Sequence, residues 1–163
     1  MSLPKVLREL LALPTAPFVE RAVMDYLERA CRPLAGVNVA YDRHGNLLAH
    51  YRHAPRTKVP LAFVAHTDHP GFIALEMVDR RTVRAAFRGG VKPEYFPGTR
   101  VRFWSDGKWV KARVLKLSKA TRITDVVGWM WKPEEALLRV TRPLAPQSPG
   151  MWRHISISST NSA

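Results

Sequence analysis

The chain has 163 residues, of which 46% are hydrophobic and 24% are charged. This composition is typical of a globular protein and excludes a chain that is disordered over most of its length. The unusual property is charge, because 26 Lys and Arg against 13 Asp and Glu give a net charge of +13.

Two helices are predicted near the N-terminus. Apolar residues at helical spacing predict a short helix over Lys5 to Leu13, which Pro14 cannot continue. The same spacing recurs from Val19 to Ala30 and predicts a second helix. Thr15 is the candidate cap of this helix, and Pro17 suits its first turn.

In the next segment, the spacing of apolar residues changes from the helical period of 3.6 to the strand period of two. Residues 37–41 alternate between apolar and polar side chains, residues 43–46 (Arg-His-Gly-Asn) predict a turn, and residues 47–51 form the return strand. The following run, Val59 to Ala65, is apolar at nearly every position. We therefore expect a strand that is covered on both faces within an α/β sheet.

Beyond residue 71 the sequence has only strand and turn patterns. Such short, evenly spaced strands predict a small barrel or sandwich with one core face and one solvated face. The predicted strands cover residues 72–78, 82–87, 100–104, 109–117, 126–131 and 136–140.

His66 and Asp68 follow directly after the predicted strand 59–65. Loops at the carboxyl end of a strand in an α/β sheet form the usual ligand crevice. An imidazole supplies a neutral nitrogen ligand for a metal, and a nearby carboxylate fixes the orientation of the ring. The pattern His-x-Asp alone is weak support for a metal site, since most such loops are merely polar.

The surrounding sequence makes the match more specific. Residues 39–49 (VAYDRHGNLLA) and 64–72 (VAHTDHPGF) resemble the dinuclear-metal aminopeptidases of the glutamyl-aminopeptidase and "endoglucanase" type, which assemble into tetrahedral particles. Segments 88–91 (RGGV), 97–101 (PGTRV) and 149–152 (PGMW) resemble further parts of that family in the same order. The resemblance spans residues 1–152.

This resemblance implies an α/β fold, namely the N-terminal part of a phosphorylase/hydrolase-like zinc-peptidase sheet domain with an inserted small β-barrel. Residues 1–72 would belong to the catalytic domain, residues 73–147 to the barrel, and residues 148–163 to a return segment and a polar tail. By the same resemblance, His66 would bind one of two catalytic Zn or Co ions, and Asp68 would be the acidic catalytic residue that orients the site. His69 is assigned no role.

The other ligands and the general base of that family follow the position of Trp152, where this chain has Arg153 and a polar tail. One His and one Asp cannot hold two metal ions. We therefore expect a truncated or frame-broken member that has little or no peptidase activity alone. An acidic portion that is absent would also account for the net charge.

Two alternatives remain open. Basic strands with tryptophans nearby are what a barrel that binds single-stranded nucleic acid would use. The residues concerned are Arg100, Arg102, Lys111, Arg113, Lys116, Lys119, Arg122, Trp104, Trp109, Trp129 and Trp131. Because basic residues also occur in the helices and the hairpin, we do not favour nucleic acid as a partner. The third hypothesis is a non-catalytic module that self-associates through its barrel.

The expected partners are peptide substrates and further copies of the chain, without a membrane. The longest apolar runs cover six or seven residues, whereas a membrane helix needs about twenty. Lys5 and Arg8 interrupt the apolar N-terminal stretch, so export is not expected. Cys31 is the only cysteine, which fits a reducing compartment, and the predicted location is the cytoplasm.

Overall fold

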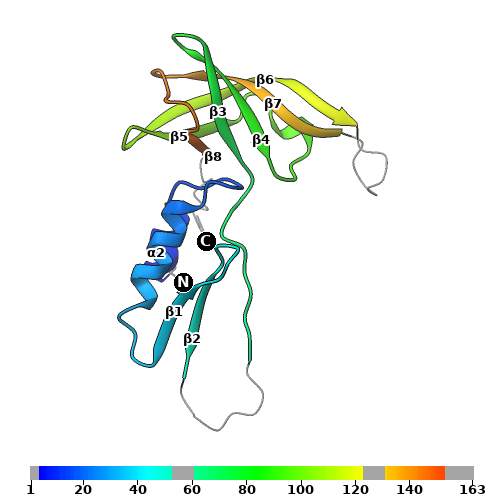
Figure 1. Cartoon of the computed structure of the whole chain (residues 1–163). Coiled ribbons are helices and arrows are strands. Elements are labelled where there is room, and N and C mark those ends of the chain that lie inside the picture. Colours follow the sequence, from blue (N-terminus) through cyan, green and yellow to red (C-terminus); the bar gives the residue numbers. More distant parts are fainter. Residues whose placement is uncertain (1–3, 53–60, 123–130, 153–163) are drawn as a thin grey trace, which may run out of the picture. The chain divides into compact units, whose positions relative to one another are not determined.

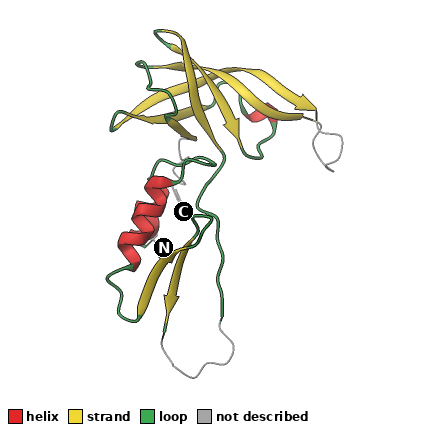
Figure 2. Cartoon of the chain, in the orientation of Figure 1, coloured by secondary structure: helices red, strands yellow, loops and turns green. Residues whose placement is uncertain are grey.

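A computed structural model describes residues 4–52, 61–122 and 131–152. The chain divides into two compact units, Met1–Asp68 and His69–Ala163. The first unit contains two helices and a β-hairpin. Figures 1 and 2 show this hairpin beside a helix, and they show the strands that dominate the second unit. No helix among these residues has the length and apolar character needed to cross a membrane.

The helices of the first unit are α1, Lys5–Leu11, and α2, Arg21–Cys31. The first begins at the predicted residue and ends at Leu11, two residues before the predicted Leu13. The second begins later than predicted, because Phe18 has a positive φ of 68° that interrupts the helical path. The Phe18 N–H donates to the Glu20 carboxylate over 2.6 Å, and Glu20 is the N-cap residue. Thr15 and Pro17 therefore lie outside the helix.

The predicted hairpin is confirmed. Strand β1, Val37–Tyr41, pairs antiparallel with β2, Leu47–Tyr51, in a two-stranded sheet. Asp42 closes the turn, because one carboxylate oxygen accepts from the backbone N–H groups of His44 (2.8 Å) and Asn46 (2.9 Å). Gly45 adopts a φ of 84°, a conformation that glycine tolerates without strain.

The strand predicted over residues 59–65 is not found. Residues 59 and 60 lie outside the described part of the chain, and residues 61–69 have no regular secondary structure. Leu61, Phe63 and Val64 are 81%, 91% and 95% exposed. A strand needs neighbouring strands to satisfy its backbone groups, and β1 and β2 pair only with each other. The α/β sheet domain of the sequence analysis is therefore not confirmed.

The second unit is a closed antiparallel barrel, as one of the two predicted all-β architectures. The strand order is β3-β4-β7-β6-β5-β8, and β8 pairs with β3 to complete the ring. The elements are β3, Gly71–Asp79; β4, Thr82–Arg88; the 3₁₀ helix η1, Pro93–Tyr95; β5, Arg100–Ser105; β6, Lys108–Arg122; β7, Trp131–Val140; and β8, Pro149–Trp152.

Alternating residues of these strands fill the barrel with one continuous apolar core. Three phenylalanines pack edge to face at its centre, with ring centroids 5.1 Å apart for Phe72 and Phe87 and 4.7 Å apart for Phe87 and Phe96. Phe96 follows η1 and is fully buried, so this loop also contributes to the core. In the described part of the first unit, by contrast, only Thr15, Ala16 and Val23 are buried.

The observed boundaries differ from the predicted ones in two places. The units divide between Asp68 and His69 rather than after residue 72. Residues 149–152, assigned to a return segment, form β8 and lie between β3 and β5 in the barrel. A four-residue strand that contains Pro149 and Gly150 has too weak a strand pattern to be recognised. The predicted strand 126–131 falls largely outside the described residues, as does the tail from Arg153.

Candidate functional site

The candidate site is the loop that carries His66 and Asp68. A hydrogen bond holds it to the helical part of the same unit, since the Thr15 hydroxyl donates to the carbonyl oxygen of Thr67 over 3.4 Å. Thr15 and Ala16 are buried, so the residue that donates this hydrogen bond is held in place by packing. His66 and Asp68 are therefore the sequence neighbours of Thr67, whose carbonyl group is held by this hydrogen bond.

His66 and Asp68 contact each other directly. The His66 Nδ1 atom lies 2.8 Å from the Asp68 carbonyl oxygen and 3.3 Å from its carboxylate oxygen Oδ1. Both Asp68 atoms are hydrogen-bond acceptors, so Nδ1 carries the proton in the neutral ring and Nε2 keeps a free lone pair. This tautomer is the one used when the second nitrogen of a histidine binds a metal.

Exposure of the pair is uneven. The His66 side chain is 81% exposed and that of Asp68 is 32% exposed. The imidazole is therefore accessible to a ligand, and Asp68 is the more fixed member. The roles of His66 as a metal ligand and of Asp68 as the acidic residue that orients the site stay predictions.

The described residues alone do not fit a catalytic metal centre. A catalytic zinc ion takes three protein ligands, and among the described residues no group of three or more His, Cys, Asp or Glu side chains could hold a metal ion. His66 offers one nitrogen, and Asp68 is already engaged with the ring. Two divalent ions would need several further ligands.

His69 begins the second unit. Its Nδ1 atom lies 3.1 Å from the carbonyl oxygen of Pro70. Pro70 packs tightly against Gly89, where a Cβ atom would lie 2.6 Å from the Cβ of Pro70. Gly89 also has a φ of 126°, so only glycine fits this close approach. The contacts of His69 are those of a loop residue and suggest no chemistry.

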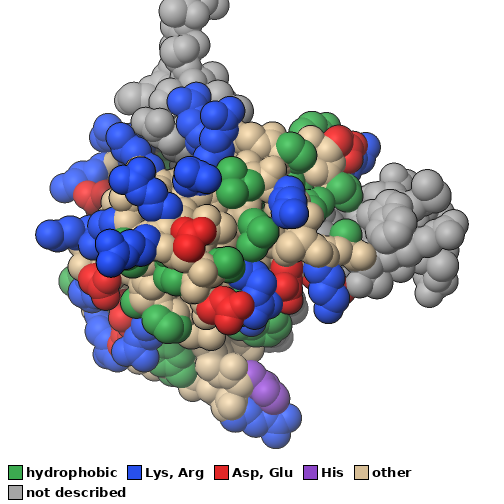
Figure 3. Space-filling view, turned by 90° about the horizontal axis from the view of Figure 1, so that it is seen from above, with side chains coloured by type: hydrophobic (Ala, Val, Ile, Leu, Met, Phe, Trp, Pro, Cys, Tyr) green, Lys and Arg blue, Asp and Glu red, His purple; other side chains and the backbone are tan. Residues whose placement is uncertain are grey.

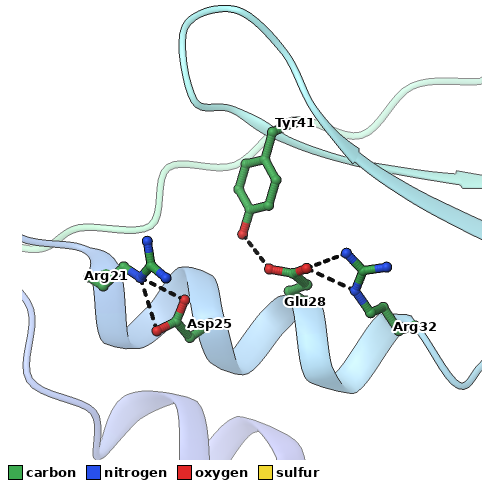
Figure 4. Close-up of polar contacts among 5 residues, drawn as sticks. All are labelled: Arg21, Asp25, Glu28, Arg32 and Tyr41. Carbon is green, nitrogen blue, oxygen red and sulfur yellow. Dashed lines mark hydrogen bonds and ion pairs between the residues drawn. The ribbon is translucent and has the colours of Figure 1, made fainter.

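Sequence analysis missed a polar network between α2 and the hairpin, shown in Figure 4. The Tyr41 hydroxyl donates to Glu28 over 2.8 Å, and Arg32 donates to the other oxygen of Glu28. Hydrogen bonds from Arg32, and secondly from Tyr41, lower the pKa of Glu28. The bond to Glu28 raises the pKa of Tyr41. The Glu28–Arg32 spacing of four residues was readable as a helical ion pair, but Tyr41 was not foreseeable as its third member.

The residues of the nucleic-acid alternative are partly placed. Arg100, Arg102, Lys111 and Arg113 lie on the outer surface of the barrel, since the residues that alternate with them are buried. Trp104 and Trp109 form a ring pair there, with centroids 5.1 Å apart. Trp129 lies outside the described residues.

A scan against protein-family models found no match, and no curated protein matched the chain. Among solved structures, the chain is similar to "3-D structure of PhTET1-12s, dodecamer in the asymmetric unit", with a TM-score of 0.64 and 15% sequence identity. The match covers 94% of this chain and 46% of that chain. This chain therefore has the fold of about half of PhTET1-12s.

Proposed function

We propose that the chain is a module of a metal-dependent aminopeptidase, in which His66 binds one metal ion and Asp68 orients the imidazole. The observation that carries this proposal is the contact between His66 Nδ1 and Asp68, which leaves Nε2 available on an exposed ring. Two similarities support it. Residues 39–49 and 64–72 resemble the tetrahedral aminopeptidases, and PhTET1-12s is a solved structure with a similar fold.

The proposed activity is hydrolysis of the N-terminal peptide bond of peptide substrates with Zn or Co ions. When bound, paired ions of this kind activate a water molecule for attack on a carbonyl group. The described residues do not supply enough ligands for such a centre, so no step of the reaction can be assigned to them. We expect the 163-residue polypeptide alone to show little or no turnover.

The direct test uses aminoacyl p-nitroanilides as substrates, with Zn or Co added. The chain is assayed alone and after co-expression with the polypeptide that its gene encodes downstream of residue 152, in each frame. We expect turnover only in the second case, with loss in His66→Ala. His44→Ala is the matched control, because His44 is another exposed histidine of the same unit. The proposal fails if no downstream frame supplies His, Asp or Glu ligands, or if His66→Ala keeps full activity.

A second measurement tests the contact between His66 Nδ1 and Asp68. Long-range ¹⁵N NMR of the imidazole groups reports which ring nitrogen is protonated. We expect the Nδ1–H tautomer for His66, because both Asp68 contacts accept a proton. Protonation of the neutral ring at Nε2 would contradict the proposed role of Asp68.

We also propose that the chain forms homo-oligomers through its barrel. PhTET1-12s is a dodecamer. The exposed apolar residues Leu61, Phe63 and Val64 could also cause association, through the first unit rather than the barrel. Light scattering coupled to size-exclusion chromatography tests both. Association that persists in Phe63→Ser/Val64→Ser supports the barrel as the interface, whereas a monomer in both proteins contradicts it.

A further inference from the structure

Three neighbouring strands of the barrel align positive side chains on its outer surface. Val101, Phe103 and Val110 are buried, so the residues between them point outward. In β5 and β6, Arg100 is opposite Arg113, and Arg102 is opposite Lys111. In β7, Arg139 is opposite Arg113, which extends the first row to three arginines. We name Arg100, Arg102, Lys111, Arg113 and Arg139 the cationic face.

This alignment is unfavourable in the isolated chain. Directly opposed like charges destabilise a sheet, and no carboxylate occupies an in-register position in these rows. Within the described residues, no ion pair joins Arg100, Lys111 or Arg139 to an acidic side chain. The pKa of Asp79 is lowered first by the hydrogen bond from the Arg81 N–H, and the charge of Arg139 is the smallest of the causes.

Other cations of the same barrel are neutralised. Arg84 forms ion pairs with Glu76 and Glu135, both at 2.9 Å, and Lys119 pairs with Glu134 at 2.9 Å. The barrel therefore places acidic side chains beside Arg84 and Lys119, so that these two cations are neutralised within the chain. Figure 3 shows Lys and Arg side chains gathered over one side of the barrel surface, with fewer Asp and Glu side chains among them.

An aromatic group adjoins the cationic face. Trp104 and Trp109 are opposite each other in β5 and β6, one row beyond Arg102 and Lys111. Their rings lie at 67° to each other, and the Arg102 guanidinium lies 4.0 Å from the centroid of Trp109. Both tryptophans are only half-buried. Planar groups that can stack on a base therefore follow directly after the charged rows.

We propose that the outer surface of β5, β6 and β7 binds single-stranded nucleic acid. Phosphates would neutralise the opposed cations of the two rows, and a base would stack on the Trp104, Trp109 and Arg102 group. An acidic polypeptide would satisfy the charges but leave the aromatic row without a specific role, so nucleic acid fits the whole surface better. This proposal uses no residue of the loop around His66, so its failure would leave the proposed metal-binding role of His66 unaffected.

The test measures binding of the full chain to a fluorescent oligo-dT of about twenty nucleotides by anisotropy over a range of salt concentrations. We expect binding that weakens steeply with salt. The variant Lys111→Ala/Arg113→Ala/Arg139→Ala should bind at least tenfold more weakly, and its slope of log K against log salt should be shallower by about 2. The matched control is Arg8→Ala/Arg29→Ala/Lys92→Ala, which removes the same charge from exposed positions elsewhere.

Two further measurements separate the contributions. Trp104→Leu should weaken binding at least fivefold with an unchanged salt slope, because stacking releases no counterions. The double variant Lys111→Ala/Arg139→Ala should melt no lower than the wild type, because it removes opposed like charges and keeps the hydrogen bond from Arg113 Nε to the Gly98 carbonyl oxygen. The proposal is overturned if oligo-dT does not bind at low salt or if the control triple loses as much affinity. It is also overturned if poly-Glu or a duplex of the same length binds as tightly.

Discussion

At the scale of single residues, Asp42 shows how a turn motif acts through hydrogen bonds. Its carboxylate accepts from two backbone N–H groups and from the side-chain amide of Asn46 over 2.7 Å. These bonds, that from the Asn46 side chain first, lower the pKa of Asp42. Residues 42–46 were part of the family resemblance, and the structure gives the same residues a purely local role in closing the hairpin.

We predict that Asp42→Ala lowers the melting temperature of the first unit by a few degrees at neutral pH. A pKa that is lower in the folded state stabilises above the ordinary aspartate value, and this stabilisation is lost as pH falls through the folded pKa. Thermal unfolding by circular dichroism at several pH values checks this. The difference between wild type and variant should shrink below the ordinary pKa of aspartate, and a constant difference would contradict the mechanism.

The network around Glu28 leads to a spectroscopic prediction. In Glu28→Gln, Tyr41 loses the negative acceptor that raises its pKa, so one tyrosine should ionise at lower pH than in the wild type. Tyrosinate absorbance during a pH titration measures this. Glu9→Gln is the matched control, because Glu9 raises the pKa of Tyr26 in the same manner. Its effect should add to that of Glu28→Gln, and unchanged titration in both variants would contradict the network.

At the scale of elements, sequence periodicity correctly predicted the helices and strands that are determined by local interactions. The first helix, the hairpin and strands such as β4 and β5 were recognised because their residues alternate or recur regularly. The tight hairpin that joins β5 to β6 is local as well, because Asp106 and Gly107 have the positive φ values that it requires. The later start of α2 was missed, since nothing in the sequence indicates a positive φ at Phe18.

Two segments were wrongly assigned because their conformation depends on distant parts of the chain. Residues 61–65 have a strand composition, but the described residues offer them no pairing strand. Conversely, β8 has a poor strand composition and forms because β3 and β5 lie on either side of it. At the site, the positions of His66 and Asp68 were identified, whereas the hydrogen bond from Nδ1 depends on the loop conformation.

Closure of the barrel at β8 should be sensitive to the size of residue 150. A Cβ atom on Gly150 would lie 2.5 Å from the Phe103 ring, which is fully buried. We predict that Gly150→Ala destabilises the barrel by about 1–3 kcal/mol through overpacking, measured by urea unfolding. Phe103→Leu removes part of the ring, so the double variant should be more stable than the sum of the single effects predicts. Strict additivity would contradict this explanation.

At the scale of the whole molecule, the two units differ in how their stability arises. The barrel has a continuous apolar core, whereas only three of the described residues in the first unit are buried. Burial of apolar surface is the main favourable term in folding. The first unit relies instead on short-range hydrogen bonds such as those of Asp42 and Glu28, which contribute little when exposed to solvent.

Hydrogen exchange followed by mass spectrometry should therefore resolve two levels of protection. Amides of β1 and β2 should exchange through openings of lower free energy than amides of β4 and β7, since opening free energies follow buried contacts. Asp42→Ala should accelerate exchange in the hairpin and leave the barrel unchanged. Gly150→Ala should do the reverse. Equal acceleration in both units by either variant would mean that the chain unfolds as one cooperative body, with contacts beyond those of each unit.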